Sequence, residues 1–223
     1  MKSTLFALLI LGVFISCNTA PETTTEVPPT EEATPNLVAE VPQLDWQAID
    51  SDEALVATAL MAAPEESRGG CKVIGFNMAG EFVTLREGSN EFICLADDPK
   101  KDGFNAACYH NSLDPFMARG RALRAEGKKA KEIFDIREEE VKAGKLSMGK
   151  EGTTLHIYYG PETMFDPESG KVKEAHYRYV VYLPFATAES TGLPEAPIAP
   201  NHPWIMDPGT HRAHIMISPL KEG

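Results

Sequence analysis

The sequence is short of basic residues. Its 223 residues include 21 Lys and Arg against 33 Asp and Glu, which gives a formal net charge of -12 at pH 7. A surface that binds nucleic acid needs Lys and Arg to replace the counterions around phosphates. The acidic balance therefore argues against nucleic acid as a partner and against attraction to an anionic membrane surface. With 43% hydrophobic residues, the chain still has enough apolar surface for a packed core.

Motifs of the common catalytic and metal-binding classes are also missing. No serine lies in the GxSxG pattern of an exposed nucleophile, and no cysteines have the CxxC spacing typical of zinc sites. His202, His211 and His214 lie near Asp207, but this segment is predicted to be extended. The odd offset between His211 and His214 then places their side chains on opposite faces. The sequence therefore predicts no metal site and no cofactor.

A long hydrophobic run occurs only near the N-terminus. Lys2 precedes an apolar segment over residues 4–15, which is too short for a permanent transmembrane helix. This pattern predicts a signal peptide over residues 1–16. Phe14-Ile15-Ser16-Cys17 resembles a bacterial lipobox, so we expect Cys17 to be lipidated, with a plain secreted protein or an uncleaved anchor as alternatives. The expected location is the bacterial cell envelope, at the outer membrane, with the lipid as the only membrane contact.

The segment after Cys17 lacks the residues of a folded core. Residues 18–36 are nearly all Thr, Pro, Glu and Ala, without Lys or Arg. Such a segment cannot bury enough apolar surface to fold, and its prolines and like charges keep it extended. We therefore expect a disordered tether over residues 17–44 and a single folded domain over residues 45–223.

The folded part is predicted to be an α+β domain. Asp50 and Glu53 resemble a capping box before a helix that ends at Pro64, and Asp114 before Pro115 resembles the N-cap of another. Two helices are expected midway along the chain, over residues 116–126 and 128–143. Strands are expected at residues 72–77, 81–86, 90–95, 153–159, 175–183, 204–206 and 212–218. The first three strands are predicted to form an antiparallel meander, and the whole sheet is predicted to be mostly antiparallel.

Without Cys17, three cysteines remain, which is an odd number for an oxidising compartment. Cys94 and Cys108 flank a polar loop, and a disulfide between them would stabilise the fold by about 3 kcal/mol. We expect this pair. Cys71 is left over and is interpreted as a buried, small apolar residue, with a cysteine nucleophile as the alternative.

Three segments together resemble a known group of sequences. They are the stretch LREGSNEFICLADD, the later Cys108 and the ending HPWIMDPGTHRAHIMI. These segments are similar to those of an uncharacterised family of secreted bacterial proteins. The resemblance supports the pairing of Cys94 with Cys108 and leaves Cys71 as the odd cysteine. It implies no activity and no catalytic residues.

Alternation of side chains along the strands indicates a candidate ligand-binding face. Each of three late strands places a histidine or an arginine opposite an apolar face. If these strands are neighbours, they form one cationic and aromatic surface that could bind a small anionic ligand or a glycan. Its members are His156, Tyr158, His176, Arg178, Arg212 and His214. The alternative is the solvated face of a half-buried sheet.

A basic cluster on the two midway helices is the other candidate surface. It consists of Arg119, Arg121, Arg124, Lys128, Lys129 and Lys131. Docking of an anionic glycan or a lipid head group is one interpretation, but two solvated helix faces with acidic partners are favoured.

These observations favour an envelope-anchored, non-enzymatic binding or structural module of unknown biochemical role. The alternative is an envelope hydrolase that uses the face with His156, His176 and His214.

Overall fold

The structure is a computed structural model that describes residues 44–219. The expected signal peptide, the lipidation site Cys17 and all of the expected tether before Leu44 lie outside the described residues. They therefore stay predictions.

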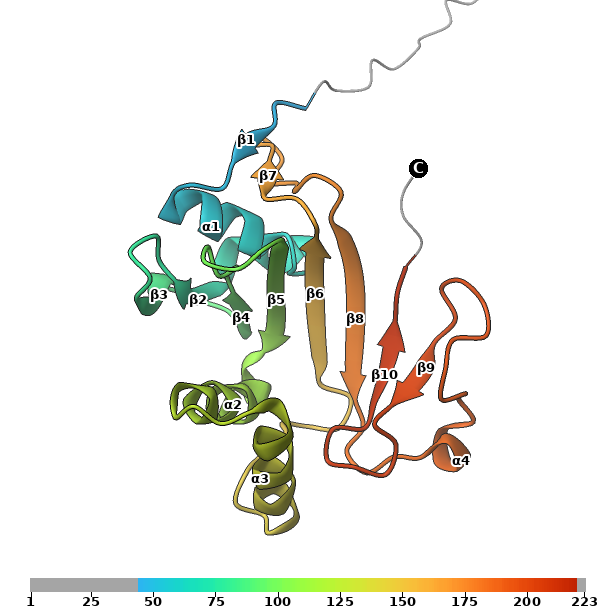
Figure 1. Cartoon of the computed structure of the whole chain (residues 1–223). Helices are drawn as coiled ribbons and strands as arrows, with labels where there is room; N and C mark the ends of the chain where they lie inside the picture. The colour runs from blue at the N-terminus through green and yellow to red at the C-terminus, as the bar shows by residue number, and fades with distance from the viewer. Residues whose placement is uncertain (1–43, 220–223) are drawn as a thin grey trace, which may run out of the picture. The chain divides into compact units, whose positions relative to one another are not determined.

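A mixed eight-stranded sheet forms the centre of the domain, in the order β3-β2-β4-β5-β6-β8-β10-β9 (Figure 1). Most neighbours are antiparallel, and β2 and β4 form a parallel pair. The strands are β2 (Lys72–Phe76), β3 (Phe82–Arg86), β4 (Phe92–Leu95), β5 (Phe104–His110), β6 (Thr154–Gly160), β8 (His176–Tyr182), β9 (Trp204–Met206) and β10 (His214–Ile217). A short separate pair is made by β1 (Gln47–Ala48) and β7 (Met164–Phe165). The predicted α+β class is confirmed.

The first helix is α1 (Asp52–Leu60), and its N-cap lies one residue later than expected. The Ser51 hydroxyl accepts a hydrogen bond from the Ala54 N–H at 3.1 Å, so Ser51 is the N-cap instead of Asp50. A 3₁₀ helix, η1 (Glu65–Gly70), follows and leads into β2.

The expected meander of the first three strands is wrong in one respect. After the β2–β3 hairpin, the chain crosses the start of β2, and β4 pairs in parallel with the other side of β2. Gly88 lies at this crossing, where an added Cβ would come within 2.7 Å of the Lys72 Cα. The backbone N–H groups of Ser89 and Asn90 both donate to the Gly70 carbonyl, which holds the crossing in place. The sequence alternation could not reveal this order, because it reports faces and not neighbours.

Two helices are inserted midway as predicted, namely α2 (Asp114–Ala125) and α3 (Ala130–Lys142). Asp114 is the first residue of α2 and is not its cap. Its carboxylate accepts hydrogen bonds from the Tyr109 hydroxyl at 2.8 Å and from Arg121 at 3.0 Å. These bonds tie α2 to β5, the strand that precedes it.

The sheet carries a separate apolar core on each face. On one face, α1 covers Val73, Cys94, Cys108 and Tyr158. On the other face, α2 and the segment after α3 pack with the sheet. The strand residues of that second core are Ala107, Tyr109, Leu155, Val180, Tyr182 and Met216. We call these the α1 face and the α2 face.

Between β8 and β9 the chain makes a long, proline-rich connection that contains a short helix, α4 (Ala188–Thr191). Thr187 caps this helix, and Gly192 ends it with a φ of 70°. Among residues 44–219, no helix is both long enough and apolar enough to cross a membrane.

Candidate functional site

The three strands of the predicted ligand-binding face are neighbours, in the order β6-β8-β10. Their register, however, divides the face. Ile157 lies opposite Arg178, and His156 lies opposite Tyr179. Partners across a ladder share a face, so His156 and Tyr158 belong to the α1 face, whereas His176, Arg178 and His214 belong to the α2 face. The single surface proposed from the sequence is therefore corrected to two groups on opposite sides of the sheet.

The two residues on the α1 face have structural partners. The Tyr158 hydroxyl is buried, donates to the Val172 carbonyl at 3.3 Å and accepts from the Val172 N–H at 3.0 Å. His156 packs edge to face against Phe92 and Tyr179, and burial lowers the pKa of its imidazole. Both side chains therefore belong to the packing beneath α1.

His214 and Arg212 are also committed to contacts within the protein. His214 is buried, and its Nδ1 lies 2.6 Å from the Arg212 carbonyl, so Nδ1 carries the hydrogen. Arg212 precedes β10, forms an ion pair with Asp207 at 3.2 Å and lies over the Phe134 ring. Burial lowers the pKa of His214, which keeps its imidazole neutral near pH 7.

Arg178 differs from these residues, because it faces a cavity. Its guanidinium lies over the Tyr159 ring, with 4.7 Å from Cζ to the ring centroid, and Nη2 donates to the Tyr159 hydroxyl at 2.8 Å. Its Nε is buried without a hydrogen-bond partner. Arg178 is also absent from the ion pairs found among residues 44–219. His176 packs edge to face on the same tyrosine.

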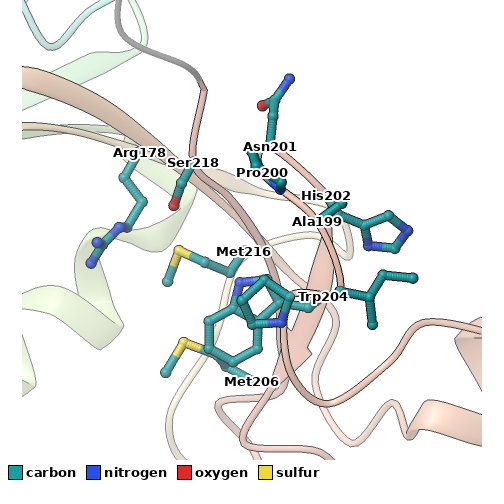
Figure 2. A pocket seen from close by; sticks show the side chains of 11 residues that line it. Arg178, Ala199, Pro200, Asn201, His202, Trp204, Met206, Met216 and Ser218 are labelled. Atoms are coloured by element: carbon teal, nitrogen blue, oxygen red, sulfur yellow. The ribbon is translucent and has the colours of Figure 1, made fainter.

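The cavity has a volume of about 690 Å³ and lies between the end of the sheet and the proline-rich connection. Trp204 and Met206 on β9 and Met216 on β10 form its apolar part, and Met216 lies directly opposite Trp204 in the ladder. Figure 2 shows Arg178 and Ser218 on one side of Met216, and Asn201 and His202 on the other side. Pro197, Ile198, Ala199 and Pro200 complete the lining.

Two polar atoms of the cavity-lining residues are buried without hydrogen-bond partners, the Arg178 Nε and the His202 Nδ1. Buried polar groups in proteins are nearly always paired, so each exception needs a reason. Here both atoms belong to residues that line one cavity. An arginine, a tryptophan and two thioethers in one cavity can hold a ligand with an anionic group and an apolar body.

Sequence reasoning found Arg178 but missed the rest of this cavity. The alternation of Trp204 and Met206 along a short strand was the available signal. It could not show that residues 197–202 fold back over that strand, because a proline-rich connection has no periodicity to read.

A second, smaller cavity of about 420 Å³ contains an acid that sequence reasoning also missed. Asp97 is only 6% exposed, and burial raises the pKa of its carboxyl to about 6. One carboxylate oxygen accepts the Asn105 N–H at 3.0 Å. This cavity is also lined by Ile49, Leu55, Met78, Pro99, Lys101, Asp102, Gly103, Pro161, Glu162 and Thr163.

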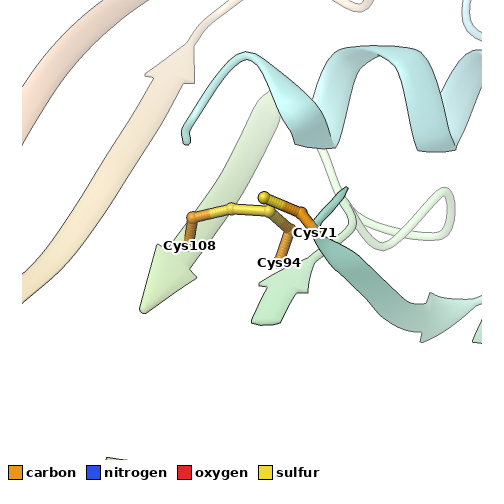
Figure 3. A group of neighbouring side chains, drawn as sticks. All are labelled: Cys71, Cys94 and Cys108. Carbon is orange, nitrogen blue, oxygen red and sulfur yellow. A yellow bond between two sulfur atoms is a disulfide. The ribbon is translucent and has the colours of Figure 1, made fainter. Parts of the chain in front are cut away.

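The predicted disulfide between Cys94 and Cys108 is confirmed (Figure 3). The two residues face each other across β4 and β5. Cys71 is buried, as expected, and is a free thiol. The sequence did not indicate its position: the Sγ atoms of Cys71, Cys94 and Cys108 lie within 4.8 Å of one another.

The remaining candidate ligands do not assemble into a common site. Nδ1 of His211 lies 3.3 Å from Glu138, next to Phe116 and Phe134, while His202 lies in the proline-rich connection. The basic cluster on α2 and α3 is largely matched by acids: Arg119 pairs with Glu140 at 2.7 Å, and Lys131 pairs with Asp135 at 2.7 Å. These pairs favour the interpretation as solvated helix faces.

Comparisons of the chain with protein-family models, with curated proteins and with solved structures found no match. The protein is therefore classified by its own structure. It is an α+β domain whose mixed sheet carries an Arg178-containing cavity at its β9–β10 end.

Proposed function

We propose that this protein is an envelope-anchored binding module whose cavity holds a small ligand with a carboxylate and an apolar body. One observation carries the proposal. Arg178 lines a cavity of mixed polar and apolar lining, its Nε is buried and unpaired, and it has no carboxylate partner among the described residues.

The position of Arg178 supports recognition of an anion. The Tyr159 ring packs against the flat face of the guanidinium, and the Tyr159 hydroxyl accepts a hydrogen bond from Nη2. A planar guanidinium held in this way has little freedom left to lose when it binds, and its remaining N–H groups match the two oxygens of a carboxylate.

The apolar part of the cavity supports recognition of a hydrocarbon or ring. Met206 and Met216 have flexible, polarisable thioethers that adapt to a ligand's shape, and Trp204 adds a flat apolar surface. The ligand's apolar area would leave water here, which is the main source of affinity in such cavities.

The alternative of a hydrolase that uses His156, His176 and His214 has lost its geometric support. His156 lies on the opposite face of the sheet from the other two histidines. Catalytic groups must lie within hydrogen-bond reach of one substrate, and groups on opposite sheet faces do not meet this condition.

A fluorescence titration tests the proposal. Trp46 is replaced with Phe so that Trp204 remains the only tryptophan, and octanoate, octanol and glucuronate are then titrated separately. We expect octanoate to shift the Trp204 emission and to bind more tightly than octanol, which has the same apolar body but no charge. Tighter binding of glucuronate than of octanoate would instead indicate a glycan-type ligand.

The matched variants are Arg178→Gln and Arg124→Gln. The first should weaken octanoate binding about tenfold or more, because a charge-assisted hydrogen bond is lost. The second removes an exposed arginine far along α2 and should leave the affinity unchanged. Equal octanoate affinity in the Trp46→Phe protein and in its Arg178→Gln variant would overturn the proposal.

A further inference from the structure

The three cysteines of the α1 face form a cluster that the disulfide alone does not explain. Their Sγ atoms lie within 4.8 Å of one another, and all three side chains are buried. Figure 3 shows the Cys71 side chain directed at the Cys94–Cys108 disulfide beneath a helical segment.

The order of the strands gives each sulfur a different place. Cys94 lies on β4, which has β2 on one side and β5 on the other. Cys108 is its direct partner on β5, and Val73 is its parallel partner on β2. Cys71 lies two residues before Val73 and therefore on the same face. Cys94 is thus the middle sulfur, with Cys71 and Cys108 on either side.

Each outer cysteine has a backbone carbonyl nearby that can accept a hydrogen bond from its thiol. The Cys71 thiol donates to the Ser67 carbonyl at 3.1 Å. Cys108 Sγ lies 4.0 Å from the Ala59 carbonyl, at the end of α1. Either outer cysteine can therefore remain as the free thiol without leaving a donor unpaired.

Asn90 connects the free thiol to the crossing between β3 and β4. Its side-chain amide donates to the Ser67 carbonyl at 2.7 Å and lies 4.0 Å from Cys71 Sγ. An amide N–H aimed at sulfur favours the thiolate, which is the form that attacks a disulfide. Burial acts in the opposite direction and raises the pKa of Cys71, so the thiolate is a minor species at pH 7.

From this geometry we infer that Cys71, Cys94 and Cys108 form an intramolecular thiol–disulfide exchange site with two disulfide isomers. The Cys71 thiol loses its proton to solvent, and its thiolate attacks Cys94 Sγ. The Cys71–Cys94 bond forms as the Cys94–Cys108 bond breaks, and the Cys108 thiolate takes up a proton. The number of electrons is conserved, so no outside oxidant or reductant takes part.

Acid-trapped peptide mapping of the full chain tests the inference. The protein is incubated at about pH 7 and about pH 9, quenched at about pH 3, and then unfolded at about pH 6 in a large excess of N-ethylmaleimide, so that thiols are capped before they can exchange. Peptides with Cys71 and Cys108 are then followed separately. We expect label on Cys71 at first, with Cys108 label appearing at a rate that rises about tenfold per pH unit while thiolate is scarce.

The Cys71→Ser variant is the matched control, because it has no attacking thiol and should never show label on Cys108. The appearance rate in the parent chain should also be independent of protein concentration, since the exchange is intramolecular. Label confined to Cys71 after prolonged incubation at about pH 9 would overturn the inference.

Two further variants test the central position of Cys94. In the presence of glutathione disulfide, Cys108→Ser should lose both remaining thiols, because Cys71 and Cys94 are neighbours. Cys94→Ser should form a Cys71–Cys108 disulfide more slowly than Cys108→Ser forms its own, because β4 lies between the strands of the two remaining cysteines although their Sγ atoms lie within 4.8 Å of each other. Circular dichroism shows whether each variant is folded. A folded Cys108→Ser variant in which Cys71 and Cys94 both stay free would also contradict the inference.

Discussion

At the scale of single residues, Asp97 is a buried acid whose surroundings disfavour its charged form. Its ordinary pKa of 3.8 is raised to about 6, chiefly because burial disfavours the charged form. The folded state therefore holds the proton more tightly than the unfolded state does. This contribution to stability is fully present below about pH 4 and is lost as the pH rises through 6. The loss is of the order of 2 to 3 kcal/mol.

Replacing Asp97 with Asn should remove most of this pH dependence. The asparagine keeps an oxygen for the Asn105 N–H and carries no charge. The unfolding free energy of Asp97→Asn should therefore decline less than that of the parent chain between about pH 4 and pH 7. Urea denaturation at both pH values measures this difference, with the exposed Asp102→Asn as control. Parallel declines in the parent chain and Asp97→Asn would contradict the pKa assigned to this carboxyl.

At the scale of elements, the start of α1 depends on one hydroxyl. The Ser51 hydroxyl accepts a hydrogen bond from the Ala54 N–H and so caps the first turn of the helix. Ser51→Ala should lower the unfolding free energy by about 1 kcal/mol. Asp50→Ala, which the sequence pattern would have marked as the damaging change, should alter it by less than about 0.5 kcal/mol. Urea unfolding of both variants gives the answer, and the reverse order would restore Asp50 as the cap.

The positions of the elements could be predicted from the sequence because they follow local rules. Apolar spacing located α1, α2, α3 and the main strands, and the polar loop between Cys94 and Cys108 indicated the disulfide. Pairing between distant strands follows no local rule. Single-strand alternation could not show that Ile157 faces Arg178, nor that β4 pairs with β2, and a shift of one residue exchanges the two sheet faces.

The candidate cavity was only partly predictable for the same reason. The sequence placed Arg178 in one candidate ligand-binding face with His156 and Tyr158, but these two residues lie on the other face of the sheet. The apolar part of the cavity depends on the close approach of residues 197–202 to β9 and β10. That approach is a tertiary contact, and no periodic pattern of residues in either segment indicates it.

At the scale of the whole molecule, anchoring through Cys17 is a separate prediction about the mature chain. Intact mass and N-terminal peptide analysis of protein isolated from a bacterial membrane fraction should find a diacylated or triacylated Cys17 as the first residue. Cys17→Ser should leave the chain unlipidated, because the thiol that carries the acyl chains is absent. An unmodified N-terminus at another residue would rule out lipidation.

The order of the strands also has a consequence for how the domain is assembled during synthesis. From β4 to β8 each main strand adds beside its predecessor as the chain emerges, but β9 precedes its only sheet partner, β10. Trp204 and Met206 therefore have no ladder to join until Met216 has been made. The cavity is the last part of the sheet to close, so a chain stalled before residue 214 would present an otherwise formed sheet with an open edge at β8.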